Sequence, residues 1–62
     1  MSATTLASAG KQYKFAKGKE RSVMAYLYLA IQSAAEDGMP ETEIARTAGV
    51  DRMTVRRALG KL

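Results

Sequence analysis

The sequence predicts an all-α protein: a tri-helical bundle that follows a basic N-terminal arm. Apolar residues recur at helical spacing from residue 20 onward, and no stretch alternates as a strand does. Gly38 and Gly49 interrupt the apolar pattern where helices would end. With 62 residues there is room for one domain, which we place at residues 20–62 after an arm of residues 1–19.

The composition narrows the possible functions. The chain has no cysteine and no histidine, so it lacks the commonest zinc ligands and the commonest catalytic nucleophile and base types. We therefore expect no metal, no cofactor and no enzymatic activity. The net charge of +4 predicts an anionic partner: nucleic acid, an acidic protein or a membrane surface. The longest apolar run, residues 23–31, is far shorter than the roughly 20 residues of a membrane helix, which favours a cytoplasmic protein.

The arm has two parts. Residues 1–10 are small and polar without a period, and this pattern predicts disorder. The stretch KQYKFAKGK that follows interleaves aromatic residues with four lysines: Lys11, Lys14, Lys17 and Lys19. It is either a solvated tail that tucks Phe15 onto the core, or an arm whose lysines pair with phosphates along a nucleic-acid groove.

Residues 20–37 form the first expected helix. Glu20 suits its first turn, and Gly38 suits a left-handed end. One face carries the expected core residues: Val23, Met24, Leu27, Tyr28, Ala30, Ile31 and Ala34. The opposite face carries Ala25, Tyr26 and Leu29, which are either ordinary exposed residues or a homodimer contact.

Residues 39–48 and 52–62 form the second and third expected helices. Pro40 fits a helix start, Gly49 fits the turn, and Asp51 is a good N-cap for the third helix. The seam between these two helices is apolar: Ile44, Ala48, Val50, Val55 and Leu59. Burial of this seam turns Met53, Arg56 and Arg57 outward, as in a recognition helix that lies in a DNA major groove.

The pattern I-A-x-x-A-G-V-x-x-x-T-V-x-R-x-L, from Ile44 to Leu59, resembles known helix-turn-helix domains. It is similar to the lactose-repressor family, to the C-terminal domains of resolvase and invertase recombinases, and to the N-terminal halves of IclR- and GntR-type winged regulators. The resemblance implies base contacts by Arg52, Met53 and Arg57, and a phosphate contact by Thr54. Met53 departs from the polar residue usual at its position, and it offers a thymine methyl only an apolar contact.

The order of elements is most similar to the resolvase type, which has a basic arm before three helices. That resemblance implies that the arm enters the minor groove beside the site. Arg56 and Lys61, with the arm lysines, are the further expected phosphate contacts. We expect a nucleoid-associated regulator or repressor of bacterial, phage or plasmid type that binds double-stranded DNA, either alone or as a homodimer, and that takes no small-molecule effector within this chain. The alternatives are a module that binds an acidic protein, or the DNA-binding part of a longer regulator or recombinase.

Overall fold

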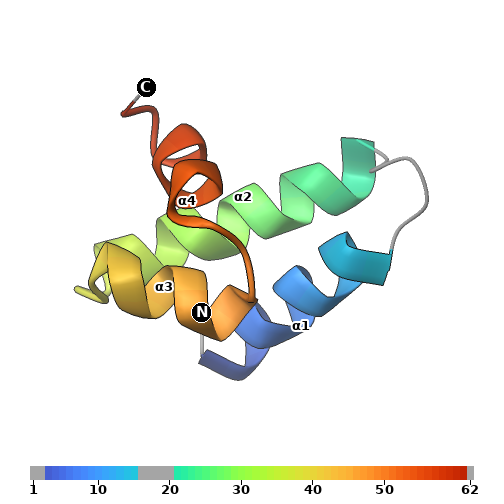
Figure 1. Ribbon diagram of the computed structural model, residues 1–62, viewed down its shortest axis with the longest axis horizontal. Helices are drawn as coiled ribbons and strands as arrows, with labels where there is room; N and C mark the ends of the chain where they lie inside the picture. The colour runs from blue at the N-terminus through green and yellow to red at the C-terminus, as the bar shows by residue number, and fades with distance from the viewer. Residues whose placement is uncertain (1–2, 16–20, 62) are drawn as a thin grey trace.

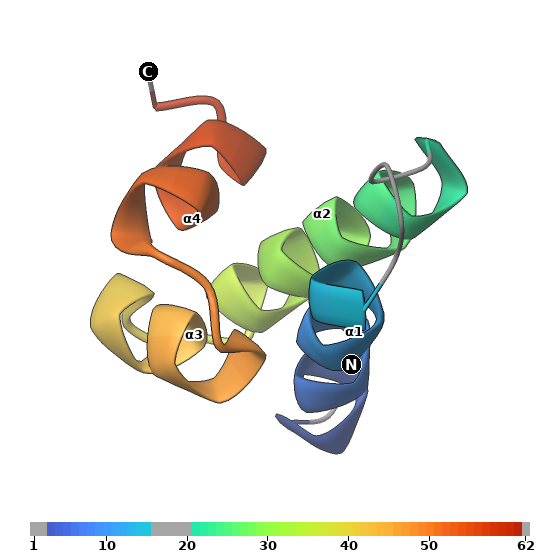
Figure 2. The same cartoon turned by 45° about the vertical axis from the view of Figure 1, so that its right-hand side comes forward.

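The computed structural model describes residues 3–15 and 21–61, and these are all-helical, with four helices and no strand. The helices are α1 (Ala3–Phe15), α2 (Arg21–Glu36), α3 (Glu41–Ala48) and α4 (Arg52–Ala58). Among them, α2 and α3 contact every other helix, whereas α1 and α4 do not touch each other (Figures 1 and 2). The all-α class is confirmed, but the described residues form four helices where three were expected. None of the described helices is both long and apolar enough to cross a membrane.

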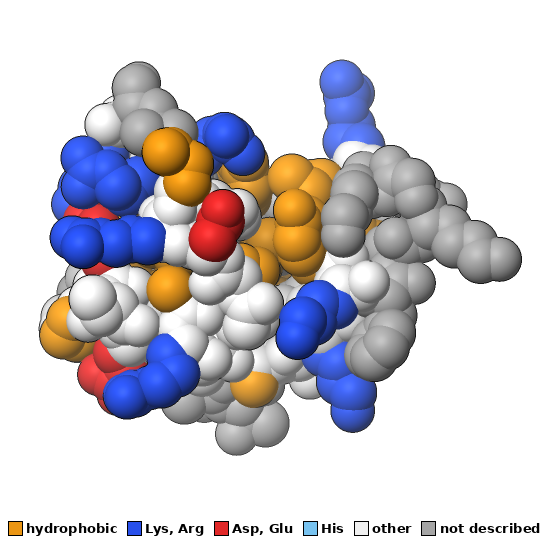
Figure 3. All heavy atoms as spheres, in the orientation of Figure 1, with side chains coloured by type: hydrophobic (Ala, Val, Ile, Leu, Met, Phe, Trp, Pro, Cys, Tyr) orange, Lys and Arg blue, Asp and Glu red, His pale blue; other side chains and the backbone are white. Residues whose placement is uncertain are grey.

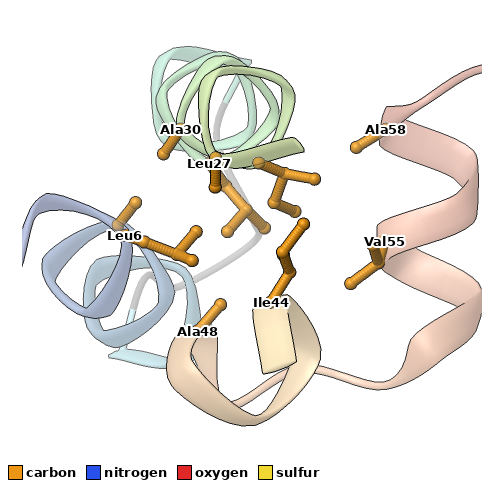
Figure 4. Packing of buried hydrophobic residues seen from close by; sticks show 10 residues of the cluster. Leu6, Leu27, Ala30, Ile44, Ala48, Val55 and Ala58 are labelled. Carbon is orange, nitrogen blue, oxygen red and sulfur yellow. The ribbon is translucent and has the colours of Figure 1, made fainter. Parts of the chain in front are cut away.

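Each helix contributes apolar side chains to one core. Leu6, Leu27, Ile31, Ile44 and Val55 are fully buried, and they come from all four helices. Figure 4 shows these helices arranged around the shared interior, with α1 and α4 on opposite sides of it and α2 and α3 between them. Every described helix therefore contributes at least one buried side chain to the same core.

Residues 1–10 were expected to be disordered, but residues 3–10 belong to the helix α1; residues 1 and 2 lie outside the described residues. Leu6 and Ala9 are completely buried, Gly10 is buried, and Tyr13 is half-buried against the core. These residues are spaced i, i+3, i+4 and i+7, so they form one stripe along the helix. The stripe consists mostly of small residues and has little apolar surface of its own. Its stabilisation comes from docking on α2 and α3, which composition does not reveal.

The helix α1 passes close to α3 at Gly10. A Cβ atom added at Gly10 would lie 1.6 Å from the carbonyl oxygen of Ala48. The two backbones are therefore nearly in contact, and only a residue without a side chain fits at this crossing.

The expected helix ends are confirmed at Gly38 and Gly49 and wrong at the third helix. Residues 52–62 were expected to be helical, but α4 ends at Ala58 and Gly60 adopts a left-handed φ of 72°. The Gly60 and Lys61 amides donate to the Arg57 and Arg56 carbonyls at 3.1 and 2.9 Å, which closes the helix as a Schellman motif. Leu62, the last residue of the expected third helix, lies outside the described residues.

Candidate functional site

The helices α3 and α4 are joined by a turn of three residues, Gly49, Val50 and Asp51. Gly49 has a φ of 72°, and the amides of Gly49 and Val50 both donate to the Ala45 carbonyl, at 2.9 and 3.1 Å. A left-handed residue is cheapest as glycine, so this position turns the chain without strain. Val50 packs against the core and anchors the turn. We refer to residues 41–58 as the α3–α4 unit.

Asp51 is the N-cap of α4, as expected. Its Oδ1 accepts the Thr54 backbone amide at 3.0 Å and also the Thr54 hydroxyl. The hydroxyl bond, and then the amide bond, lower the pKa of the Asp51 carboxyl below its ordinary value of 3.8. Thr54 is itself buried, with 7% of its surface exposed. A hydroxyl has one proton to donate, so Thr54 has none left for a phosphate in this conformation.

Burial of one side of α4 fixes what its other side presents. Val55 is fully buried, whereas Met53 is 51% exposed and Arg57 is exposed. Met53 and Arg57 are four residues apart and so lie together on the helix surface, which we call the outer face of α4. Since α1 does not contact α4, α1 does not cover this face.

A side chain of α2 holds the end of α4. Gln32 Nε2 donates a 2.9 Å hydrogen bond to the Ala58 carbonyl, in the last turn of α4 where carbonyls lack helical partners. This bond, together with the buried contacts of Val55 and Ala58, fixes the position of α4 on α2.

Three basic side chains beside the outer face converge on one carboxylate in the first turn of α3. Glu41 Oε1 lies 3.7 Å from Arg52 Nε and 3.4 Å from Arg56 Nη1, and Oε2 lies 2.6 Å from Lys61 Nζ. The Lys61 hydrogen bond is the largest cause that lowers the pKa of the Glu41 carboxyl, and the charges of Lys61, Arg56 and Arg52 add to it. We call these four residues the Glu41 cluster. Sequence reasoning missed it, because Arg56 and Lys61 follow Glu41 by 15 and 20 residues and no local period links them.

The basic residues of the expected arm that are described lie on α1. Lys11 and Lys14 are exposed, and Lys14 Nζ lies 3.7 Å from the point that a Cβ of Gly49 would occupy. The ammonium therefore sits beside the α3–α4 turn. Lys17 and Lys19 lie outside the described residues. In Figure 3, basic side chains gather over the α3 and α4 side of the molecule, and a second group lies over α1.

The expected dimer face is only partly free. Leu29 is 59% exposed and Ala25 is exposed, but Tyr26 is half-buried against the core. Gln32, three residues after Leu29, is occupied by α4. Of the three residues expected in a dimer contact, Leu29 and Ala25 are therefore the exposed ones.

Within residues 3–15 and 21–61, no pocket opens and no three acidic side chains come together. Comparisons with models of protein families, with curated proteins and with solved structures find no match for this chain. The features of this chain that point to a function are the geometry of the α3–α4 unit and the residue pattern from Ile44 to Leu59.

Proposed function

We propose that this protein binds double-stranded DNA as a small helix-turn-helix regulator, with α4 in the major groove. The outer face of α4 carries this proposal: Met53 and Arg57 project from the second of two helices that a three-residue turn holds together, and α1 leaves them uncovered. A recognition helix needs this combination of a packed inner side and an uncovered outer face that is able to reach base edges.

Each residue has a role in the proposal that its chemistry supports. Arg57 and Arg52 are exposed, and a guanidinium recognises guanine through two hydrogen bonds. Met53 gives an apolar contact to a thymine methyl. Arg56 and Lys61 flank the helix and would meet phosphates. Thr54 is left out of the contact set, because its hydroxyl caps α4 through Asp51.

For Lys11 and Lys14 we propose a fixed position on a helix in place of the flexible arm that was expected. Lys11 and Lys14 belong to a docked helix, and Lys14 stands beside the α3–α4 turn. We propose that they contact the DNA backbone from this fixed position. A groove-following arm would apply only to Lys17 and Lys19, which are not described.

The test begins with selection of a binding site from random duplexes, followed by footprinting. On the selected site, Arg57→Ala should cost about 1–3 kcal/mol and relax the preference at one base pair, because a bidentate arginine–guanine contact is lost. Arg21→Ala is the matched control, since Arg21 begins α2, eleven residues before the Gln32 that contacts α4. Unchanged affinity in Arg57→Ala would remove α4 from the recognition role.

A second candidate, a module that binds an acidic protein, draws on the same basic surface. A titration with random duplex at low salt separates the two, because a DNA-binding domain with this surface binds any duplex weakly through its phosphates. Absence of binding there would favour the protein partner.

We also propose that two copies associate through Leu29 and Ala25, because Leu29 is the most exposed large apolar side chain among the described residues. Paired helix-turn-helix units commonly bind half-sites about one DNA turn apart. Sedimentation of the chain with and without the selected duplex tests this, and Leu29→Gln should weaken the association. A monomer in both conditions at high concentration would contradict it.

A further inference from the structure

We propose that Glu41 is an internal competitor for DNA phosphate: in the free protein it binds three cations that flank the outer face of α4, and so it weakens sequence-independent binding. This inference rests on the proposed function, because it concerns the same basic surface. It adds a residue of opposite charge to the basic residues of the proposed contact set.

The geometry of the Glu41 cluster resembles that of an occupied anion site. The two carboxylate oxygens divide the cations between them, Oε1 facing Arg52 and Arg56, and Oε2 facing Lys61. Phosphate offers cations the same kind of charged oxygens at the same distances. The carboxylate therefore stands where a phosphate group of a bound duplex would have to bind these side chains.

The carboxylate of the Glu41 cluster is more buried than its three cationic partners. The Glu41 side chain is 18% exposed, whereas those of Arg52, Arg56 and Lys61 are 63%, 39% and 50% exposed. The cations remain within reach of a ligand from solution while the carboxylate is held in the first turn of α3. Exposed ion pairs of this kind are individually weak, so a duplex is able to displace Glu41, but only by giving up part of its binding free energy.

The charge balance gives the competition its direction. One negative charge faces three positive charges, so the Glu41 cluster still attracts an anion, but less strongly than the three cations would alone. While they stay on Glu41, Arg56 and Lys61 do not bind phosphate, and Arg52 is kept from the duplex as well. This weakens binding to every duplex and lowers the number of counterions released.

The experiment compares Glu41→Gln with the matched control Glu43→Gln on random-sequence duplex over a range of salt concentrations. Both variants remove one negative charge from the first turn of α3, but Glu43 makes no ion pair with the described residues. We expect Glu41→Gln to bind on the order of tenfold more tightly than Glu43→Gln at low salt, with a salt slope steeper by about 0.9 for each additional phosphate that the freed cations neutralise.

A second variant separates competition from net charge. Glu41→Asp keeps the charge and shortens the side chain by one methylene, which pulls the carboxylate away from its three partners. We expect it to bind random duplex more tightly than the wild type although the net charge is unchanged. Glu41 variants that bind no more tightly than their controls, or more weakly, would show that Glu41 positions the cations and would overturn the inference.

A further experiment without DNA distinguishes failure of this inference from failure of the proposed function. If the wild type binds no duplex at low salt, the proposed function fails, and titration with tripolyphosphate then decides the inference. Tighter tripolyphosphate binding by Glu41→Gln than by Glu43→Gln would support competition at this site. Equal affinity of the two variants would overturn it.

Discussion

At the scale of single residues, two carboxylates contact α4 or the residues beside it. Asp51 holds the first turn of α4 through the amide and the hydroxyl of Thr54. Glu41, in the first turn of α3, binds the Arg52, Arg56 and Lys61 side chains. Both contacts need the ionised form of the acid, and both lower the pKa of their carboxyl group.

These lowered pKa values predict how the free energy of unfolding depends on pH. The unfolded chain takes up protons near the ordinary values of 4.5 for Glu41 and 3.8 for Asp51, before the folded chain does. The stabilisation is therefore fully present above these values and is lost as the pH falls through the lowered values of the folded state. Urea unfolding across this acidic range should show that the free energy of unfolding decreases as the pH decreases.

The double variant Glu41→Gln/Asp51→Asn provides the comparison for this pH dependence. It should have a flatter curve than the wild type, because both shifted carboxyls are gone. Glu43→Gln, which removes an acid outside both contacts, should keep the steeper curve. Identical curves for the wild type and the double variant would show that other groups control the acid response.

At the scale of elements, the packing of α1 against α3 links the N-terminal helix to the rest of the fold. Leu6 and Ala9 enter the core from α1, and Gly10 allows the helix to lie directly on the carbonyl of Ala48. Ala48 ends α3 immediately before the turn to α4. The position of α1 is therefore coupled to the α3–α4 unit through backbone contact.

Gly10→Ala tests this docking. In an exposed helix the substitution stabilises slightly, because alanine is the better helix former. Here the added Cβ would overlap the Ala48 carbonyl, so we expect it to lower the free energy of unfolding by about 1–3 kcal/mol. Ser8→Ala, at an exposed position of α1, should stay within roughly 0.5 kcal/mol of the wild type. A Gly10→Ala variant as stable as the wild type in urea unfolding would mean that α1 is not docked.

The arrangement of the whole molecule separates two groups of basic residues. One group lies beside α4 and the other lies on α1, and these two helices are on opposite sides of the core (Figure 4). Lys14 of α1 reaches the turn at Gly49 that leads into α4. With a net charge of +4, the molecule thus carries positive charge both beside α4 and on α1.

The contribution of α1 to DNA binding is testable through its salt dependence. Lys14→Ala should weaken binding to all duplexes alike and reduce the salt slope by about 0.9, as expected when one phosphate is no longer neutralised. Arg21→Ala removes the same charge from the far end of α2 and should leave the slope unchanged. Equal slopes for Lys14→Ala and the wild type would place α1 away from the DNA backbone.

The sequence by itself determined the elements that local chemistry controls. The helical period of α2, the glycines that end α2 and α3, the Asp51 cap and the outward position of Met53 and Arg57 were all predicted. Each depends on neighbours within about one or two helical turns, which a single sequence displays directly. The end of α4 was predicted wrongly, because residues 52–62 were expected to be helical and Gly60 was placed inside the helix instead of after its end.

Tertiary structure alone decided the remainder, because the contacts responsible join distant residues. The stripe of small residues on α1 has too little apolar surface to predict a docked helix, and α1 is held by its packing on α2 and α3, where Gly10 meets the Ala48 backbone. Glu41 shows no sign in the sequence of the cations that follow it by up to 20 residues. Both features depend on contacts between residues that are far apart in the sequence. Such contacts produce no periodic pattern along the chain that would predict them.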